Sequence, residues 1–268
     1  MSKGRLRIGR INFSNLFPIF YGLEKFTDCS PYEFVEGVPS AVNRLLREGK
    51  IDISPSSSIE YIKNEDDYIL MDNHSITSAG PVGSILLFSK RPMEGLFGAT
   101  VLVSSQSETS VALLDIVLNK FHKMNCVLRS SDEPLSRGIE SYPAYLLIGD
   151  NALRESLRWP GLYKYDLGEI WHRKTGLPFV FALWIGRKDS YANKPELFAQ
   201  FKRDLDTAKA NALKNLTTIA RESSILGFLS EDEIVSYWKG ISYDLSDEHI
   251  KGLELFRKYA EELNLVHI

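Results

Sequence analysis

Cysteine is scarce in this sequence, and no long apolar run occurs. Cys29 and Cys126 are the only cysteines among 268 residues, and neither belongs to a CxxC pair or a Cys/His cluster, so nothing supports a disulfide scaffold or a structural zinc site. No stretch approaches the roughly 18 apolar residues of a membrane helix. Polar residues interrupt the apolar ones of the basic amino-terminal segment, which therefore lacks a signal-peptide core. We expect a cytoplasmic protein with reduced thiols and no membrane partner.

Positive charge and catalytic signatures are also lacking. The formal net charge is −3 and no dense run of Lys or Arg is present, so we expect no nucleic-acid partner. The sequence has no GxSxG, Walker, HExxH or GxGxxG motif, which leaves hydrolase, NTPase, zinc-protease and dehydrogenase activities without support from a motif. The histidines are scattered without ligand spacing, so we expect no metal site.

What the sequence does have is an alternation of strand and helix patterns, which predicts an α/β fold. Short runs rich in β-branched and aromatic residues predict strands over 5–12, 32–40, 51–54, 81–90, 99–105, 144–150 and 177–188. Amphipathic segments predict helices over 16–23, 40–50, 111–121 and 151–159. After Pro195 helical patterns continue, with helix-start signals at Ser230, which Glu233 follows, and at Ser246.

Two long β-rich runs divide the chain into two lobes. The runs over 81–90 and 177–188 each end in a basic, flexible segment, and we interpret them as paired crossings between the lobes. The first lobe then comprises residues 1–88 and 186–268 and is completed by the carboxy-terminal helices, while the second comprises residues 89–185. A cleft between two lobes is a common site for a small ligand.

Serine and threonine residues gather where predicted strands end and helices begin. The strongest example is SSQSETS, residues 104–110, and a second is SPSSS, residues 54–58. Hydroxyls and helix-start amides at such junctions can bind carboxylate or phosphate oxygens, and their recurrence at one edge of the predicted sheets favours an anion site. Helix capping is the alternative explanation. The pairs with capping spacing are Ser105 with Glu108, Ser107 with Ser110, and Ser57 with Glu60.

Asp150 and Thr175 each have two interpretations. Asp150 follows a predicted strand and precedes a predicted helix, so its carboxylate either caps that helix or points into the cleft as a functional acid. Thr175 precedes an aromatic-rich strand that is most simply core, and it is also a candidate for the cleft lining.

Seven stretches of the sequence together resemble a known family. In order they are RIGRINFSNLFPIFYGL, EGVPSAVNRLL, GKIDISPSSSIEY, VGSILLFSK, SSQSETSVALL, LLIGDNAL and YDLGEIWHRKTGLPFVFALW. They resemble the menaquinone-biosynthesis chorismate dehydratases of the futalosine route, over residues 5–190 and with consistent spacing. Phe13 departs from the family pattern, in which tyrosine is common at this position. The positions that match the pattern include Asn15, Ser84, Thr109 and Asp150.

The resemblance implies a cytoplasmic enzyme with the two-lobed α/β fold of type II periplasmic binding proteins. The implied reaction converts chorismate to 3-[(1-carboxyvinyl)oxy]benzoate and water. The ring carbon that bears the enolpyruvyl ether loses a proton, and the neighbouring hydroxyl leaves. Because the product ring is aromatic and the conjugated ring carboxylate acidifies that proton, the resemblance implies no metal and no redox cofactor.

The resemblance also suggests roles for the hydroxyl-rich junctions. On the second lobe, one substrate carboxylate is assigned to Ser105, Gln106, Ser107, Thr109 and Ser110. On the first lobe, the other polar groups of the substrate are assigned to Ser56, Ser57 and Ser84. Asn15 orients the leaving hydroxyl or a carboxylate. The base is either Asp150 or the substrate's own enolpyruvyl carboxylate, and we slightly favour the substrate.

Two other functions remain as alternatives. One is the sibling enzyme of the same pathway and fold, 1,4-dihydroxy-6-naphthoate synthase, against which the segments RIGRINFSN and IDISPSSSIEY speak. The other is a non-catalytic small-anion-binding protein on the same fold, although the sequence shows neither the signal peptide of an exported receptor nor the helix-turn-helix of a DNA-binding sensor. The sequence leaves the oligomeric state open, with a homodimer as one alternative.

Overall fold

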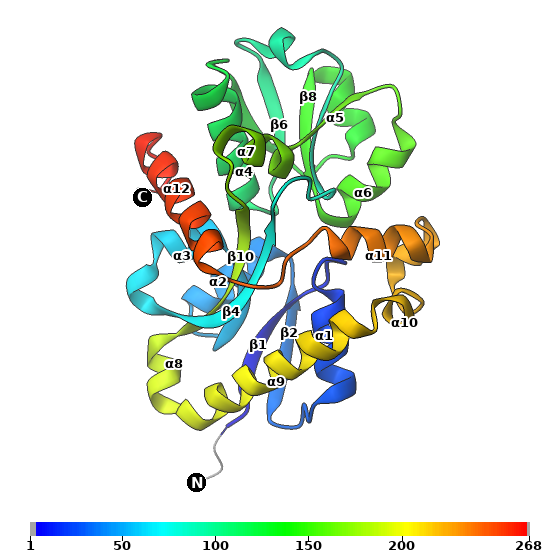
Figure 1. Cartoon of the computed structure of the whole chain (residues 1–268). Coiled ribbons are helices and arrows are strands. Elements are labelled where there is room, and N and C mark those ends of the chain that lie inside the picture. Colours follow the sequence, from blue (N-terminus) through cyan, green and yellow to red (C-terminus); the bar gives the residue numbers. More distant parts are fainter. Residues whose placement is uncertain (1–3, 267–268) are drawn as a thin grey trace. The chain divides into compact units, whose positions relative to one another are not determined.

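Two five-stranded sheets organise residues 4–266, which are the residues that the computed structural model describes. The chain divides into two α/β units (Figure 1). Unit 1 comprises the described residues up to Ile76, Ala182–Lys239 and Tyr243–Leu245. Unit 2 comprises Thr77–Phe181, Gly240–Ser242 and the described residues from Ser246 onward. The predicted α/β class is confirmed, and residues 1–3 and 267–268 of the expected first lobe lie outside the described residues.

The sheet of unit 1 has the strand order β2-β1-β3-β10-β4. Its strands are β1 (Leu6–Ile11), β2 (Tyr32–Gly37), β3 (Ile53–Ser57), β4 (Tyr68–Ser78) and β10 (Phe179–Arg187). Its helices are α1 (Phe17–Phe26), α2 (Pro39–Arg47), α3 (Ser58–Lys63), α8 (Lys188–Asn193), α9 (Pro195–Lys214), α10 (Leu216–Ala220) and α11 (Glu231–Lys239). β1 pairs in parallel with both β2 and β3, and β10 runs antiparallel to β3.

The sheet of unit 2 has the strand order β7-β6-β8-β5-β9. Its strands are β5 (Ile85–Ser89), β6 (Thr100–Ser104), β7 (Val127–Ser131), β8 (Ala144–Ile148) and β9 (Tyr163–Asp166). Its helices are α4 (Glu108–Asp115), which continues as a π-helical turn over Ile116–Phe121, α5 (Leu135–Ser141), α6 (Gly149–Arg158), α7 (Leu167–Thr175) and α12 (Asp247–Glu262). β6 pairs in parallel with β7 and β8, whereas β5 runs antiparallel to β8 and β9.

The chain passes from one unit to the other within β4 and within β10. The division falls after Ile76 in β4 and before Ala182 in β10. The run over 81–90, expected to be the first crossing, instead forms β5, which is paired on both sides within unit 2. The first crossing is therefore corrected to β4, whose polar middle hides its strand pattern in the sequence.

The carboxy-terminal helix α12 belongs to unit 2 and not, as expected, to the first lobe. Its Phe256 ring lies 4.9 Å from the Phe179 ring and 6.4 Å from the Trp171 ring, measured between centroids. A Cβ on Gly252 would lie 2.1 Å from the Pro178 carbonyl oxygen, so this helix approaches the backbone before β10 very closely. These buried aromatic contacts explain the assignment of α12 to unit 2.

Each unit has its own aromatic core. In unit 1, the buried Trp184 ring lies 5.7 Å from the Phe20 ring and 5.6 Å from the Phe201 ring, which joins β10 to α1 and α9. In unit 2, the fully buried Trp171 ring lies 5.1 Å from the Phe179 ring. Burial of such large rings supplies much of the stability of a domain of this size.

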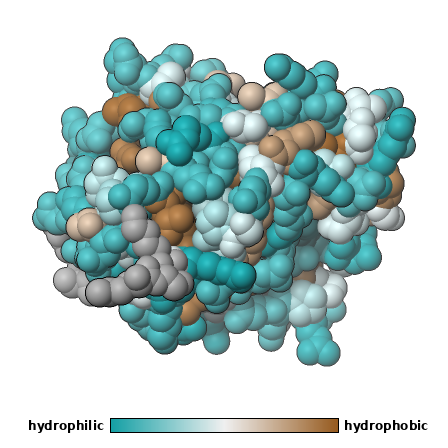
Figure 2. Space-filling view, turned by 90° about the horizontal axis from the view of Figure 1, so that it is seen from below, coloured by the Kyte–Doolittle hydropathy of each residue, from teal (hydrophilic) through white to brown (hydrophobic). Residues whose placement is uncertain are grey.

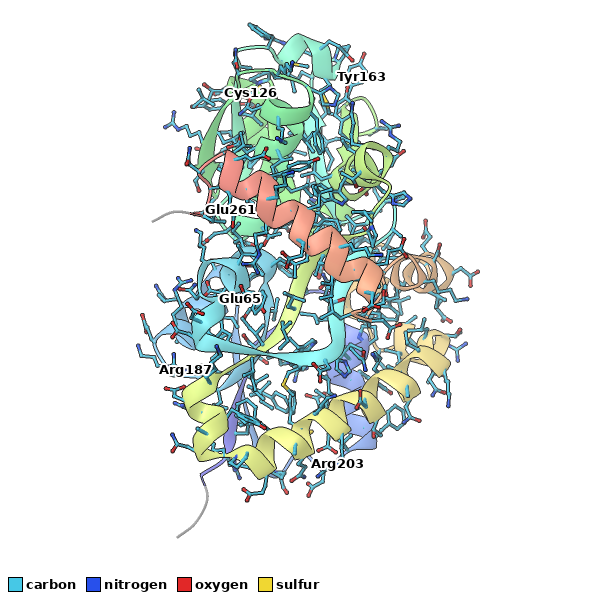
Figure 3. The ribbon with its side chains drawn as sticks, turned by 60° about the vertical axis from the view of Figure 1, so that its left-hand side comes forward. Glu65, Cys126, Tyr163, Arg187, Arg203 and Glu261 are labelled. Atoms are coloured by element: carbon cyan, nitrogen blue, oxygen red, sulfur yellow. The ribbon has the colours of Figure 1, made fainter. Side chains whose placement is uncertain are left out.

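The predicted helix-start signals are confirmed. Cys29 and Cys126 are both free cysteines (Cys126 is labelled in Figure 3). Ser230 exchanges hydrogen bonds with Glu233, and Ser246 forms a capping box with His249. None of the helices within residues 4–266 has the length and apolar character needed to cross a membrane. The face shown in Figure 2 is mainly hydrophilic, with its apolar side chains scattered among polar ones.

His74 on β4 is a buried titratable group of unit 1. Its Nε2 lies 2.8 Å from Asp206 Oδ1, and its side chain is 2% exposed. Burial, together with the charge of Lys209, lowers the pKa of His74 from 6.5 to about 4. As the pH falls through this window the unfolded chain binds a proton that the folded chain does not, so the folded state loses stability.

We therefore expect His74 to reduce the free energy of unfolding by ~2 kcal/mol between pH 8 and pH 5. Urea unfolding at the two pH values measures this difference. In the variant His74→Gln the free energy of unfolding should fall much less between pH 8 and pH 5, because glutamine does not titrate in this range. A drop of the same size in the variant would show that other groups cause it.

Candidate functional site

Parallel strands end together at one edge of the sheet of unit 2. Val103 of β6 lies opposite Leu146 of β8, so both strands reach the same edge at their carboxyl ends. α4 begins shortly after β6, and α6 begins directly after β8 at Gly149. Helix starts that follow parallel strands form the usual ligand-binding edge of an α/β sheet. Segment 104–110 and Asp150 therefore share this edge.

Ser84 reaches the same edge through antiparallel pairing. Ile85 at the start of β5 lies opposite Ile148 at the end of β8. The Gly149 N–H donates to the Ser84 carbonyl oxygen at 2.7 Å, and the Ser84 side chain is buried. Ser84 lies in unit 2, so its expected place on the first lobe is corrected; the misplacement follows from the wrong first crossing.

The segment 104–110 combines a helix cap with exposed polar groups. Ser107 is the N-cap of α4: its Oγ accepts the Ser110 N–H at 3.2 Å and donates to the Ser110 Oγ at 3.0 Å. This confirms one capping alternative and excludes the pair Ser105 with Glu108, because Ser105 is exposed and donates to Asp132 instead. Thr109 is buried in the first turn of α4. The positive end of the α4 dipole makes this segment favourable for an anion.

Asp150 lies in the first turn of α6 and is not its N-cap. The N-cap position is held by Ile148, which makes no side-chain capping bond. The partly buried Asp150 carboxylate therefore follows the cap position, where negative charge is stabilised by the helix dipole. Gly149 has φ +60°, a backbone conformation that favours glycine and turns the chain sharply from β8 into α6.

Asp166 organises the backbone just before Ser84. Its carboxylate accepts the Gly83 N–H at 2.6 Å and the Val82 N–H at 3.0 Å, and it also caps α7 by accepting the Glu169 N–H at 3.1 Å. Burial raises the pKa of Asp166, and these backbone donors act in the opposite direction. Asp166 was not among the residues predicted for the site. The signal that identifies it is the capping spacing of Asp166 and Glu169 ahead of a helical segment.

The sheet of unit 1 has a corresponding edge. Ile11 at the end of β1 lies opposite Gly37 at the end of β2, and β3 runs parallel to β1. The carboxyl ends of these strands therefore meet, and they are followed by the segment 12–16, by α2 and by α3. Asn15, Ser56 and Ser57 lie at this edge.

Three serines of the segment 54–58, Ser54, Ser56 and Ser57, lie in the buried strand β3, and Ser58 begins α3. β3 continues through Ser57 because Ser56 pairs with Leu183 and Ser57 with Ala182 of β10. Ser54 Oγ and Ser56 Oγ lie 2.6 Å apart in a hydrogen bond, and Ser57 Oγ accepts the Asn43 Nδ2 at 2.9 Å.

The capping box predicted for Ser57 and Glu60 is wrong. Ser57 is the N-cap of α3 but makes no side-chain capping bond. The Glu60 carboxylate is fully buried and is bound by Arg47, by the Tyr68 hydroxyl at 2.8 Å and by Asn64 Nδ2 at 3.1 Å. A buried carboxylate needs strong partners, and these partners hold it away from the helix start.

Asn15 lies in a loop, residues 12–16, that two aromatic donors hold in place. Trp238 Nε1 donates to the Ser14 carbonyl oxygen at 2.7 Å, and the Tyr243 hydroxyl donates to the Asn15 carbonyl oxygen at 2.8 Å. The buried Asn15 Oδ1 has no hydrogen-bond partner among the described residues. A buried acceptor without a partner costs about 1–3 kcal/mol, so Asn15 Oδ1 is a candidate to accept a hydrogen bond from a ligand.

A pocket of about 190 Å³ lies beside this loop within unit 1. It is lined by Arg10, Ile11, Asn12, Phe13, Ser14, Phe17, Phe20 and Ser224. The Arg10 guanidinium is paired with Glu24 and lies 5.2 Å from the centre of the Phe20 ring. The pocket thus adjoins the edge of the sheet that carries Asn15.

Thr175 has a local role at the end of α7. Its Oγ1 donates to the Trp171 carbonyl oxygen at 2.9 Å and accepts the Leu177 N–H at 3.1 Å. These two hydrogen bonds close the carboxyl end of α7, and both engage the Thr175 hydroxyl. Across residues 4–266 no cluster of three or more His, Cys, Asp or Glu side chains is arranged to hold a metal ion.

Solved structures identify the class of fold. Protein AF1704 from Archaeoglobus fulgidus superposes with a TM-score of 0.81 at 18% identity, covering 99% of this chain and 100% of that one. The alkanesulfonate-binding protein SsuA from Xanthomonas axonopodis pv. citri, solved with MOPS bound, gives a TM-score of 0.72 at 14% identity, covering 99% of this chain and 95% of that one. The fold is that of the periplasmic binding proteins, as expected.

The chain belongs to a family described as "Menaquinone biosynthesis", whose model matches residues 6–262. Chorismate dehydratase from Thermus thermophilus is 29% identical, with 96% of this chain and 95% of that protein covered. Chorismate dehydratase from Campylobacter jejuni is also 29% identical, with 96% and 98% covered. The 1,4-dihydroxy-6-naphtoate synthase from Thermus thermophilus is 24% identical, with 91% and 82% covered.

Proposed function

We propose that this protein is a chorismate dehydratase that converts chorismate to 3-[(1-carboxyvinyl)oxy]benzoate and water in the cytoplasm, within the futalosine route of menaquinone biosynthesis. The observation that carries the proposal is the similarity to two chorismate dehydratases over 96% of this chain. The hydroxyls and helix starts at the sheet edges suit a substrate with two carboxylates.

The proposed reaction is an elimination across two neighbouring ring carbons. A base removes the hydrogen of the carbon that bears the enolpyruvyl ether as a proton, and the electron pair of that C–H bond enters the ring. The C–O bond of the neighbouring hydroxyl then breaks, and the hydroxyl takes up a proton and leaves as water. Negative charge develops on the ring carboxylate before the hydroxyl leaves. Donors aimed at that carboxylate therefore stabilise the transition state more than the substrate, which is how preorganised polar groups accelerate a reaction.

The segment 104–110 is assigned to the ring carboxylate. The hydroxyls and amides there come from Ser105, Gln106, Ser107, Thr109 and Ser110. The amino end of α4 adds the favourable end of its dipole. Ser110 and Ser107 also bond each other, which fixes their orientation before the substrate arrives.

Ser84 and Asn15 are assigned to the polar groups that react. Asn15 Oδ1 is a hydrogen-bond acceptor. It can bind the hydrogen of the leaving hydroxyl, whereas a substrate carboxylate has no hydrogen to donate to it. Ser84 supplies a hydroxyl at the edge of unit 2, and its carbonyl oxygen accepts the N–H of Gly149, the residue before Asp150. Ser56 and Ser57 are assigned to weaker contacts, because their hydroxyls already bond to Ser54 and Asn43. Thr175 is retained only as part of the surrounding structure.

We assign the role of base to the substrate's own enolpyruvyl carboxylate, which is tethered beside the proton. Asp150 then supports the site without removing the proton. The variant Asp150→Asn should keep kcat within about tenfold of the wild-type value, because it removes charge but not the base. Steady-state kinetics with chorismate measure this, together with a binding titration. Loss of nearly all turnover with binding retained would make Asp150 the base.

The sibling reaction is the alternative function, and the lower identity and coverage of the naphtoate synthase argue against it. Mass spectrometry separates the two functions. Incubation with chorismate should give a product lighter by one molecule of water. A protein that leaves chorismate unchanged but consumes the cyclic futalosine derivative would be the sibling enzyme.

A further inference from the structure

The loop that carries Ser84 is short and rich in glycine. We call residues 79–84 the Ser84 loop; it connects β4 to β5 within unit 2. Gly80 has φ +130° and Gly83 has φ +75°, conformations that side chains rarely adopt. A backbone with two such glycines has many alternative conformations, so the position of Ser84 depends on contacts from outside the loop.

The Asp166 carboxylate supplies such contacts with its two oxygens. Oδ2 accepts the Gly83 N–H at 2.6 Å and the Val82 N–H at 3.0 Å. Oδ1 accepts the Glu169 N–H at 3.1 Å and so caps α7, and it also lies 3.1 Å from the Val82 nitrogen. One carboxylate thus ties the Ser84 loop to the first turn of a helix.

The first turn of α7 also packs directly on the loop. A Cβ on Gly168 would lie 2.7 Å from the Gly80 carbonyl oxygen and 2.7 Å from Ser78 Oγ. Ser78 Oγ in turn donates to that carbonyl oxygen at 2.9 Å. The same Cβ would lie 3.3 Å from Asp166 Oδ1, so the first turn of α7, the carboxylate and the loop pack together at one place.

The loop is held from its other end as well. The Gly149 N–H donates to the Ser84 carbonyl oxygen at 2.7 Å, directly before Asp150. The backbone of Ser84 is therefore fixed on both sides, by Asp166 through the two preceding amides and by the start of α6 through its own carbonyl group. A hydroxyl on so fixed a backbone is preorganised.

We propose that Asp166 is a positioning residue for Ser84: its Oδ2 holds the Val82 and Gly83 amides so that the Ser84 hydroxyl meets the substrate in the reactive geometry. The proposal rests on the proposed function, in which Ser84 contacts chorismate. Capping of α7 alone is the competing role for Asp166, and that role requires only Oδ1.

The variant Asp166→Ser separates the two roles. Serine is a good N-cap, so α7 stays capped, but it has no second oxygen for the loop. We expect kcat to fall at least about tenfold, while KM changes much less. A displacement of a catalytic group by about 1 Å can lower the rate by about 10²-fold. The matched control is Ser246→Ala, which removes a cap from α12 in the same unit and should leave kcat unchanged.

A double variant tests whether Asp166 acts through Ser84. If it does, Asp166→Ser should cost little further activity in a Ser84→Ala background, because the group being positioned is already gone. Gly168→Ala offers a second route: its Cβ would meet the Gly80 carbonyl oxygen and Ser78 Oγ at 2.7 Å, and it should lower kcat by displacing the loop. Full kcat in Asp166→Ser, or multiplicative losses in the double variant, would overturn the proposal.

Hydrogen exchange distinguishes failure of this proposal from failure of the proposed function. The Val82 and Gly83 amides should exchange at least about tenfold faster in Asp166→Ser than in the wild-type protein. If these two amides exchange faster while the fold stays like that of the wild-type protein, Asp166 holds the Ser84 loop, even if chorismate is not the substrate. Unchanged exchange at both amides would overturn it whatever the substrate is.

Discussion

Replacement of Ser84 by alanine should lower kcat/KM for chorismate about 100-fold, the effect of removing one preorganised donor from a charged transition state. Ser84 is buried at the edge of the unit 2 sheet, and its backbone is held by Gly149 and, through the two preceding amides, by Asp166. The free energy of unfolding should change by only about 1 kcal/mol, the net value of one hydrogen bond. Steady-state kinetics and urea unfolding measure the two quantities.

The matched control for this variant is Ser89→Ala. Ser89 ends β5, the strand that Ser84 precedes, and it is also fully buried. Its hydroxyl donates to the Arg91 carbonyl oxygen at 2.7 Å, at the end of the strand opposite the proposed site. We expect Ser89→Ala to lose stability and keep its activity. Equal kinetics in Ser84→Ala and the wild-type protein would remove Ser84 from the site.

Replacement of Asn15 by leucine should also lower kcat/KM about 100-fold while leaving the protein at least as stable. Asn15 Oδ1 is a buried acceptor without a partner among the described residues, and such a group costs about 1–3 kcal/mol when nothing binds it. Leucine has a similar shape and no polar atom to leave unpaired. A loss of activity without a loss of stability is the pattern expected of a side chain maintained for its ligand.

Asn64→Ala is the control for the Asn15 variant. Asn64 also lies in unit 1, and its Nδ2 donates to the Glu60 carboxylate at 3.1 Å, a purely structural contact. This variant should lose stability and retain kcat/KM. If Asn15→Leu is less stable but fully active, Asn15 is structural and the leaving hydroxyl is bound elsewhere.

The sequence predicts much of the fold because several of its strands are buried and apolar. β1, β6, β8 and β10 are short apolar runs bounded by polar turns, and each was expected within a few residues of its observed bounds. β7 was missed because its residues are mostly exposed, and β4 because Asp72 and Asn73 interrupt it. Strands whose pairing is decided by distant partners have a weak local pattern.

The candidate site was predicted in parts. The segment 104–110, Ser84 and Asp150 share an edge of one sheet, and Ser107 caps α4 at the spacing that the sequence shows. The pair of Ser57 and Glu60 has equally good spacing, yet strand pairing and burial give both residues other partners. Local spacing does not report burial. The spacing of Asp166 and Glu169 indicates a helix cap, but the bonds of Asp166 to Val82 and Gly83, far back in the sequence, leave no local pattern.

The most direct measurement of the central claim is a proton NMR time course of the purified protein with chorismate. We expect the ring signals of chorismate to disappear as aromatic signals of 3-[(1-carboxyvinyl)oxy]benzoate appear in equal amount, with the enolpyruvyl methylene signals retained and no cofactor added. A folded protein that leaves chorismate as stable as it is in buffer alone would contradict the assignment.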